Sequence, residues 1–388
     1  MPTTFFGQLF SPRMLVAFLM GFACGVPLLL TGSVLQAWMT EEGVDLTVIG
    51  LYSLVGLPYT LKFLWAPVFD RFTLPLFGRR RGWMLVTQVC LIVGLIGLGL
   101  TDPARSPWVV AGAAFLVTFL SASQDIVIDA YRREDLRDNE LGLGSSLYVN
   151  GYRVGMLLAG SGGLILADHF SFAQVYLMMA ATLLVGVVTT LLCREPALTR
   201  GTPRTFREAV VEPFTDYFQR DRALALLLFI LLYKLGDQMA STMTTPFYLD
   251  LGFTKTEIGA VAKLFGFWSA IAGGLLGGAI LSFTALALAG HTVVGLAVAI
   301  TLEQLTSGMG TAAYVAYMAS LTNRRFTATQ YALLSSCMGV PRVIVAAPAG
   351  WLADLFGWPL FFVGCTLIAL PGLALLPLVG RQYRRDVQ

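Results

Sequence analysis

The sequence predicts an all-α polytopic membrane protein, and three observations lead to that fold class. Hydrophobic residues make up 56% of the 388 residues, and charged residues make up only 13%. The mean hydropathy is +0.72. Soluble domains carry about 25% charged residues, so a chain this apolar cannot cover a surface that faces water. The apolar residues lie in long runs, and within lipid only helices or closed barrels satisfy the backbone polar groups.

The apolar runs are separated by charged residues, glycine or proline, and they define the predicted membrane-spanning helices. We expect helices at 13–38, 48–69, 83–101, 107–130, 142–167, 171–193, 223–249, 257–280, 292–320, 327–353 and 358–380. The loop arginines gather on one side of this arrangement, whereas the other side holds only Arg105 and Lys255. Because basic loops stay in the cytoplasm, both termini are predicted to be cytoplasmic.

The longest polar stretch divides the chain near its middle. We expect a six-helix bundle over 1–193, a cytoplasmic linker over 194–222 and a second bundle over 223–388. Apolar residues of the linker recur at helical spacing and predict an amphipathic helix on the inner membrane surface. They are Phe206, Val210, Val211, Phe214 and Phe218. Two six-helix bundles around a midplane cavity are the plan of the major facilitator fold.

The second bundle is one crossing short of this plan. The turn at 250–255 must lie outside and Arg324 inside, so an odd number of spans must separate them, yet only 257–280 and 292–320 do. We expect about 20–25 residues, the length of one span, to be missing between Ala279 and Ala287. The alternative is a short or re-entrant helix at 281–290, which makes the ninth helix incomplete.

Nine ionisable residues lie within the predicted spans, where lipid penalises charge and favours a cavity or an ion partner. They are Lys62, Asp125, Asp129, Arg153, Lys234, Asp237, Lys263, Glu303 and Arg342. Asp125 and Asp129 are four residues apart and share one helix face. Two neighbouring buried carboxylates are suited to hold a proton reversibly, so we expect Asp125, Asp129 and Glu303 to serve proton coupling. The alternative is a latch in which each carboxylate pairs with a nearby arginine.

Polar residues near mid-depth are the predicted contacts for the solute. Lys234 and Asp237 share a face and either neutralise one another or open to take a carboxylate. Lys62, one turn from Tyr59, suits an anion or an oxygen-rich sugar. The predicted substrate contacts are Tyr59, Lys62, Gln124, Arg153, Lys234, Asp237, Gln238 and Gln304.

An inner gate is predicted where the second span ends at Asp70 and Arg71, close to the inner-loop arginines at 79–81. Free N–H groups at a helix start attract a carboxylate. We therefore expect Asp70 to contact the helix start near Thr327 and Ala328, or an arginine of the 131–137 loop, when the inner side is closed. The gating residues are predicted to be Asp70, Arg71, Arg132 and Arg133. The alternative is a solvated Asp70 that balances the nearby arginines.

Catalytic and metal motifs are missing from the sequence. His169 and His291 stand singly near helix ends, and the five cysteines lie in or beside apolar runs without a CxxC pair. No phosphate-binding GxxxxGK[ST] loop occurs. We expect no enzyme activity, no metal, no cofactor and no nucleic-acid partner, and transport driven by a gradient or facilitated.

Three strings carry a family resemblance that extends through essentially the whole chain. They are PYTLKFLWAPVFDR at 58–71 with FGRRRGW at 77–83, SASQDIVIDAY at 121–131, and NRRFTATQYALLS at 323–335 with Gly350 and Trp351. The chain resembles the AmpG-type muropeptide permeases and their acetyl-CoA transporter relatives. It departs from them between Ala279 and Ala287, where the family has a full ninth helix.

The resemblance implies a monomeric, proton-coupled symporter in the lipid bilayer of the Gram-negative inner membrane. It implies import of N-acetylglucosaminyl-1,6-anhydro-N-acetylmuramyl peptides from periplasm to cytoplasm during cell-wall recycling, which feeds β-lactamase induction. The charge pattern alone leaves two alternatives. One is a carrier of another anionic solute, such as an acyl-CoA or a sugar acid, and the other is a sensor that does not transport.

Overall fold

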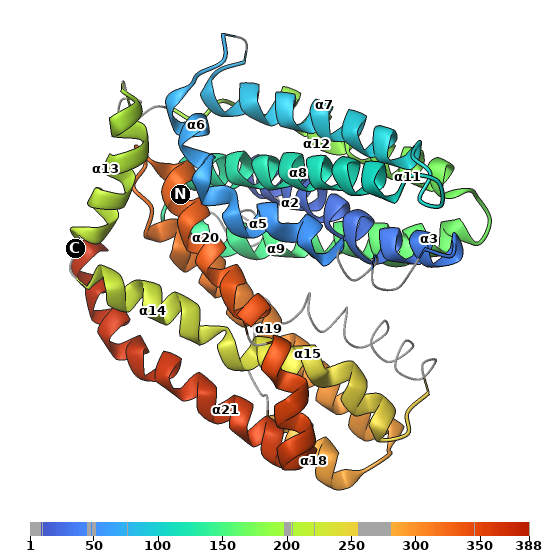
Figure 1. Cartoon of the computed structure of the whole chain (residues 1–388). Coiled ribbons are helices and arrows are strands. Elements are labelled where there is room, and N and C mark those ends of the chain that lie inside the picture. Colours follow the sequence, from blue (N-terminus) through green and yellow to red (C-terminus); the bar gives the residue numbers. More distant parts are fainter. Residues whose placement is uncertain are drawn as a thin grey trace. The chain divides into compact units, whose positions relative to one another are not determined.

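The computed structural model describes residues 11–44, 52–75, 77–197, 205–220, 222–254, 281–344 and 346–387, together with residues 9, 48 and 203. Apart from one isolated bridge between Leu74 and Gly78, the regular elements in these ranges are helices (Figure 1). Seven of the described helices are long and apolar enough to cross a membrane. They are Pro12–Glu41, Arg79–Gly99, Pro107–Asp135, Phe172–Leu192, Ala223–Asp250, Val293–Ser320 and Pro348–Gly372. The all-α membrane class predicted from the sequence is confirmed.

The chain forms two compact units. Unit 1 contains residues 1–214 and 315–333, and unit 2 contains residues 215–314 and 334–388. The boundaries fall within α13 (Phe206–Phe218), α19 (Val293–Ser320) and α20 (Thr327–Ile344). The start of α20 therefore groups with the N-terminal helices, and the division at the linker predicted from the sequence stays a prediction.

Unit 1 contains helices that run alongside one another (Figure 1). Its elements are α2 (Pro12–Leu29), η1 (Leu30–Val34), α3 (Leu35–Glu41), η2 (Tyr52–Gly56), α5 (Leu57–Leu61), η3 (Lys62–Leu64), α6 (Ala66–Arg71), α7 (Arg79–Gly99), α8 (Pro107–Asp135), α9 (Leu141–Leu157), η4 (Leu158–Gly162), α10 (Gly163–Ala167), α11 (Phe172–Thr182) and α12 (Leu184–Leu192). Helix α2 packs on α9 and α8, and α7 packs on α8, α11 and α12. This packing surrounds the polar residues of α8 with helices.

Two of the unit 1 spans are broken, which places polar groups at the interruptions. The second span is a chain of short helices in which Pro58 and Pro67 each occupy a first turn. Proline has no N–H donor and is best tolerated in a first turn, so Pro58 and Pro67 favour the start of a new helix at each of these points. Tyr59 and Lys62 lie in these short helices. The first span is interrupted at Gly32, whose φ of −106° and ψ of −110° are not helical.

Glycine sets the distance between α2 and α9. A Cβ atom added at Gly25 would lie 2.0 Å from the Tyr152 carbonyl oxygen, and one at Gly151 would lie 2.0 Å from that of Phe18. Gly21 and Gly155 show the same close approach. Small residues allow two helices to pack backbone to backbone within a bilayer. The first and fifth spans are therefore held together without intervening side chains.

Unit 2 contains α14 (Ala223–Tyr233), α15 (Leu235–Asp250), α18 (Leu281–Ala289), most of α19 and α21 (Ala346–Val387). The seventh span breaks at Lys234, between α14 and α15. The element α21 turns at Gly357, whose φ of +70° suits glycine, so the last predicted helix begins beyond it. Helix α18 has nine residues and rises about 13 Å, too little to span. The predicted helix 257–280 lies outside the described residues, as do the first two residues of the region 279–287, whereas α18 forms the rest of that region.

Three predicted helix ends are wrong, and one of them is the end of the last helix, which continues to Val387 and not only to residue 380. Helix α7 begins at Arg79 and not at residue 83, and α8 continues to Asp135 and not only to residue 130. The charged residues of these extra turns pair with one another, as described below, so they do not end the helices. The linker helix predicted from apolar spacing is present as α13. On it Val211 and Phe218 are 44% and 53% exposed, whereas Tyr217 is buried.

Candidate functional site

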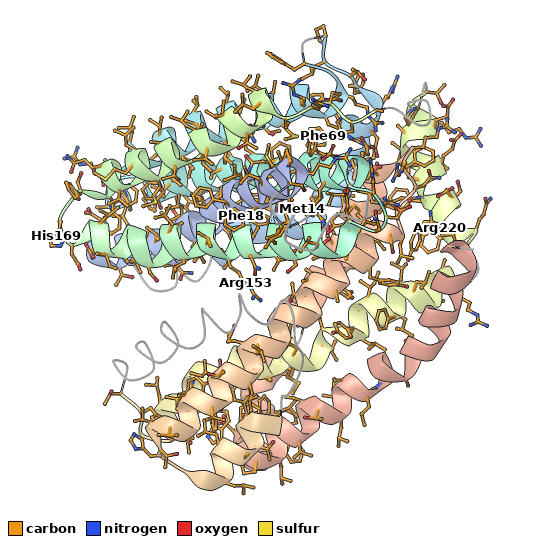
Figure 2. The ribbon with its side chains drawn as sticks, turned by 180° about the vertical axis from the view of Figure 1, so that it is seen from behind. Met14, Phe18, Phe69, Arg153, His169 and Arg220 are labelled. Atoms are coloured by element: carbon orange, nitrogen blue, oxygen red, sulfur yellow. The ribbon has the colours of Figure 1, made fainter. Side chains whose placement is uncertain are left out.

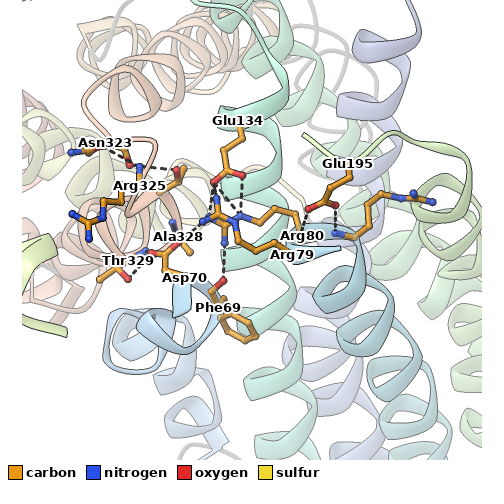
Figure 3. A network of polar contacts seen from close by, with 12 residues as sticks. Phe69, Asp70, Arg79, Arg80, Glu134, Glu195, Asn323, Arg325, Ala328 and Thr329 are labelled. Atoms are coloured by element: carbon orange, nitrogen blue, oxygen red, sulfur yellow. Dashed lines mark hydrogen bonds and ion pairs between the residues drawn. The ribbon is translucent and has the colours of Figure 1, made fainter. Parts of the chain in front are cut away.

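Asp70 ends α6 and binds the start of α20 (Figure 3). Its carboxylate accepts hydrogen bonds from the Ala328 N–H at 3.2 Å, and from the N–H and hydroxyl of Thr329, both at 2.8 Å. The side chain is fully buried. N–H groups in the first turn of a helix have no partner within the helix, so a carboxylate satisfies them and complements the helix dipole. The predicted contact between Asp70 and this helix start is present.

Arg80 completes the surroundings of Asp70. It is fully buried, and it donates to Asp70 at 2.8 Å, to the Phe69 carbonyl at 3.0 Å and to both carboxylate oxygens of Glu134. Arg79 donates to Glu134 as well. Two arginines thus balance two carboxylates, which allows all four to be buried. The alternative of a solvated Asp70 among loop arginines is wrong, because Arg79 and Arg80 lie in a helix and are buried.

A reciprocal cap ties the end of α12 to the start of α7. The Glu195 carboxylate accepts from the backbone N–H groups of Arg80 and Arg81 at 2.8 and 2.9 Å. In return the Arg81 guanidinium donates to the carbonyls of Thr190 and Leu191 in the last turn of α12. An anion at one helix start and a cation at the other helix end both favour the helix dipoles. The point where the linker leaves unit 1 is fixed by these contacts.

The linker helix α13 contacts the first turn of α20 and the residues just before it. Arg325 pairs with Glu208 at 3.1 Å and with Glu212 at 3.4 Å, and the Gln330 amide donates to the Pro213 carbonyl at 3.0 Å. The segment 323–330 is therefore held both by α6, through Asp70, and by α13. These contacts explain why the start of α20 groups with unit 1.

A second buried cluster lies deeper along α8. Asp129 is 5% exposed, and its Oδ1 accepts from Arg132 at 3.1 Å, whereas its Oδ2 lies 4.0 Å from the Lys62 ammonium. Arg132 also donates to the Ser145 hydroxyl at 2.6 Å and to the Tyr331 hydroxyl at 2.9 Å. Asp129 therefore joins the broken second span to an arginine that contacts α9 and α20.

Asp125 lies one turn before Asp129, within the same cluster. It is 7% exposed, and its Oδ1 has no hydrogen-bond partner among the described residues. The Cys24 thiol of α2 lies within hydrogen-bonding reach of it, and Lys62 is the cation that faces it. A buried charged oxygen without a partner is costly, so this carboxyl is better accommodated with a proton or a bound cationic group.

Gln124 and Tyr59 line the same region. The fully buried Gln124 donates to the Ala23 carbonyl at 3.1 Å, while its Oε1 has no partner within the described part of the chain. The Tyr59 hydroxyl donates to Ser121 at 2.9 Å. The sequence singled out Lys62 with Tyr59 and Asp125 with Asp129 as separate pairs; the structure brings them into one region, and their roles stay predictions.

The remaining predicted residues of unit 1 lie apart from this cluster. Arg133 pairs with Asp138 at 3.0 Å, and Arg71 stacks on the Phe72 ring. Arg153 projects from α9 away from the other helices of unit 1 (Figure 2). Asp129 therefore pairs with Lys62 and Arg132 in this structure.

In unit 2, Lys234 forms an ion pair with Asp237 at the break between α14 and α15. The ammonium lies 2.8 Å from the Asp237 carboxylate and 3.2 Å from the Thr311 hydroxyl. Lys234 is 7% exposed. Gln238 follows Asp237 on α15, and Glu303 and Gln304 lie on α19, where Glu303 is buried near Tyr248. Lys263 and the side chain of Arg342 lie outside the described residues.

Several residues of the site were missed from the sequence. Arg80, Glu134 and Glu195 stand at the ends of apolar runs, where charge is expected in a loop. Tyr331 and Tyr148 carry no charge and merge with the apolar pattern. The three consecutive arginines after Gly78 were a usable signal, because three cations require anions near them. The described residues contain no cluster of histidine, cysteine or carboxylate groups that could hold a metal.

The profile of the Major Facilitator Superfamily matches residues 13–282 of this chain. The anhydromuropeptide permease of Escherichia coli K12 is 43% identical over 395 aligned positions, which cover 96% of this chain and 80% of that protein. Transporter AmpG 4 of Rickettsia felis is 31% identical over 95% of this chain and 97% of its own length. Because 96% of this chain is about 372 residues, about 23 aligned positions of the Escherichia coli comparison have no counterpart here, roughly one membrane crossing.

Two solved structures share the fold at low sequence identity. The proton:xylose symporter XylE is 10% identical, with a TM-score of 0.68 and coverage of 94% of both chains. The human organic anion transporter MFSD10 is 16% identical, with a TM-score of 0.60, and covers 94% of this chain and 97% of its own. These likenesses establish the helical architecture alone.

Proposed function

We propose, from the premise that this chain belongs to the anhydromuropeptide permeases of the Major Facilitator Superfamily, that it imports anhydro-muropeptides together with protons. It is a multi-pass membrane carrier and not an enzyme. The observation that carries the substrate assignment is the 43% identity over 96% of the chain to a permease of that name. The proposal includes import from periplasm to cytoplasm across the Gram-negative inner membrane. It also includes cytoplasmic termini, a monomeric state and the supply of the inducer of β-lactamase.

The buried cluster of unit 1 supports the proton part of the proposal. Asp125 has a buried oxygen without a partner in the described residues and a lysine facing it, so its charge is sensitive to whatever occupies the site. Asp129 already has Arg132 and is less suited to change its charge. Asp125 is therefore the proposed proton carrier, Asp129 assists it, and Glu303 is a further candidate in unit 2.

The substrate groups fit the polar residues of both units. A muropeptide presents carboxylates, amides and sugar hydroxyls. In unit 1, Tyr59, Lys62, Gln124 and Arg153 offer donors and acceptors of the matching kinds. In unit 2, the Lys234–Asp237 pair opens to exchange its internal carboxylate for one of the substrate, assisted by Gln238 and Gln304. Asp70, Arg71, Arg132 and Arg133 serve the inner gate.

Uptake into vesicles tests this proposal. Purified protein in liposomes with an acidic exterior is expected to accumulate labelled anhydro-muropeptide, and a protonophore is expected to abolish the accumulation. Cells that lack the protein are expected to shed anhydro-muropeptides into the medium. Uptake that ignores the protonophore would contradict proton coupling. Tight binding without uptake would favour a sensor, and accumulation of an acyl-CoA or sugar acid instead would overturn the substrate.

A further inference from the structure

One nitrogen atom of Arg132 joins the buried cluster to the start of α20. Its Nη2 donates to Asp129 at 3.1 Å and to the Tyr331 hydroxyl at 2.9 Å. A guanidinium nitrogen of this kind has two hydrogens, so both are in use. If the guanidinium rotates far enough to break one of these two hydrogen bonds, the geometry of the other changes as well.

Two tyrosine rings set the position of this guanidinium. Its central carbon lies 4.7 Å from the Tyr148 ring centroid and 5.5 Å from that of Tyr331. Both distances lie within the range of cation–π attraction, which is strong where water is excluded. Since Tyr148 belongs to α9 and Tyr331 to α20, Arg132 holds the two helices through its charged head.

Asp129 is shared between two cations, one at each of its carboxylate oxygens. Arg132 is hydrogen-bonded to it, whereas Lys62 stands 4.0 Å away, which is too far for a direct hydrogen bond. Lys62 also faces Asp125, so two carboxylates compete for one lysine. Once Asp125 takes a proton, Asp129 is the remaining charged carboxylate of this cluster and attracts Lys62 more strongly. A closer Lys62 ammonium then competes with Arg132 for the negative charge of Asp129.

We propose that Tyr331 is the positioning residue through which the charge of the Lys62–Asp129–Arg132 cluster controls the start of α20. The inference rests on the proton coupling proposed above. A proton from the periplasmic side binds to Asp125 and neutralises its carboxylate. Lys62 then moves towards Asp129, and the hydrogen bond between Arg132 and Tyr331 weakens. The inner gate then opens, and the same proton leaves to the cytoplasm. The titratable and charged groups that face Asp125 are Cys24 of α2, Tyr59 of α5, Lys62 of η3, Asp129 of α8 and Tyr148 of α9.

Tyr331 has a different task from Asp70. Asp70 binds backbone N–H groups of Ala328 and Thr329, and the side chain of its partner Arg80 donates to Asp70, Phe69 and Glu134 within the described part of the chain. Asp70 therefore holds the start of α20 whatever the charge of Asp125. Tyr331 adds a contact that responds to that charge, so the stability of the start of α20 depends on the protonation state of Asp125.

Hydrogen exchange of the full-length protein in lipid nanodiscs tests this assignment without any substrate. The readout is the exchange of the backbone amides of 327–335 at neutral and acidic pH, corrected for intrinsic rates. The wild type is expected to exchange faster at acidic pH. Tyr331→Phe keeps the ring and removes the hydroxyl, so exchange at neutral pH is expected to rise about fivefold, the factor for one net hydrogen bond, and to lose its response to pH.

A matched variant separates this effect from the loss of any buried hydroxyl. Tyr176→Phe removes a buried hydroxyl of unit 1 that donates to the Leu30 carbonyl at 2.6 Å, and it is expected to keep the wild-type response. Asp129→Asn combined with Tyr331→Phe is expected to do no more than either change alone, because both act through Arg132. A wild type without a pH response, a Tyr331→Phe protein that keeps it, or additive effects would each overturn the assignment.

The proposed function fails independently of this inference. If the wild type shows the pH response but accumulates no anhydro-muropeptide, the transport assignment fails and the role of Tyr331 stands. If uptake is proton-driven but Tyr331→Phe exchanges as the wild type does, the role of Tyr331 fails and the transport assignment stands.

Discussion

The two buried charge clusters of unit 1 are built differently. Around Arg80 the carboxylates of Asp70 and Glu134 are held by short hydrogen bonds, and Asp70 is fully buried. In the deeper cluster Arg132 holds Asp129 at 3.1 Å, but Lys62 stands 4.0 Å from Asp129, and Asp125 keeps an oxygen without a partner in the described residues. The two carboxylates beside Arg80 are satisfied, whereas the Asp125 carboxylate of the deeper cluster is not.

The difference indicates that one cluster stabilises a fixed contact and that the other can change its charge state. A satisfied buried network is rigid, and removing one member leaves the others uncompensated in a medium of low dielectric. An unsatisfied carboxyl gains from a proton or a ligand, so its state changes readily with conditions. The Arg80 cluster is thus suited to be a latch, and the Lys62 cluster is suited to bind a proton or a ligand. Substitutions in the two clusters test this difference, because we expect those around Arg80 to lower stability and that at Asp125 to abolish accumulation driven by a pH gradient.

The largest effect is expected for Arg80→Met. The change leaves Asp70 and Glu134 buried without their shared cation, so the free energy of unfolding is expected to fall by about 3–5 kcal/mol. The measurement is the unfolding midpoint of the purified protein in detergent. Arg105→Met is the control, because Arg105 is 86% exposed and its pairing with Asp102 contributes at most about 1 kcal/mol. Equal midpoints for the two variants would remove the distinction between the clusters.

Asp70→Asn is expected to have an intermediate effect. The variant keeps the shape but loses the charge that binds the start of α20, which weakens the contact by roughly 1–3 kcal/mol. The population is then expected to shift towards the inward-open state and turnover to slow, with affinity per competent state little changed. Inter-spin distances between labels at the exposed Asn139 and Gln219, with Cys90 replaced by serine, measure the shift. Glu42→Gln at an exposed site is the control, and identical distributions for Asp70→Asn and the control would show that Asp70 is no latch.

The smallest effect on stability is expected for Asp125→Asn. The unpartnered oxygen loses no hydrogen bond, so the unfolding midpoint is expected to stay near that of the wild type. Accumulation driven by a pH gradient is nevertheless expected to vanish, while exchange of substrate at equal concentrations on both sides continues. Asp129→Asn is expected to lose less accumulation, because its main contact is with Arg132. Normal accumulation by Asp125→Asn would remove Asp125 from the proton path.

The sequence predicts the described spans and the position of the deeper cluster well, for physical reasons. Lipid requires long apolar runs, and a charge within such a run stands out, as Lys62 and Asp129 do. Asp70 was placed correctly because a carboxylate near a helix start has a partner that the chain itself specifies.

The satisfied cluster was harder to predict from the sequence. Arg80 and Glu134 end apolar runs, and only three-dimensional packing shows that they bury one another instead of facing water. Glu195 caps a helix that begins more than a hundred residues earlier, a distance over which no spacing rule applies. Tyr331 acts through its hydroxyl and ring, and composition does not distinguish it from a residue that faces lipid.

The backbone contact between α2 and α9 has a consequence for synthesis. Gly21 and Gly25 leave the ribosome before Gly151 and Gly155, which are translated roughly ten seconds later at rates of about 5–20 residues per second. During that interval the nascent chain presents a glycine face that suits any small-residue helix nearby. Slowed translation between the first and fifth spans is therefore expected to raise misassembly more than the same delay placed later in the chain.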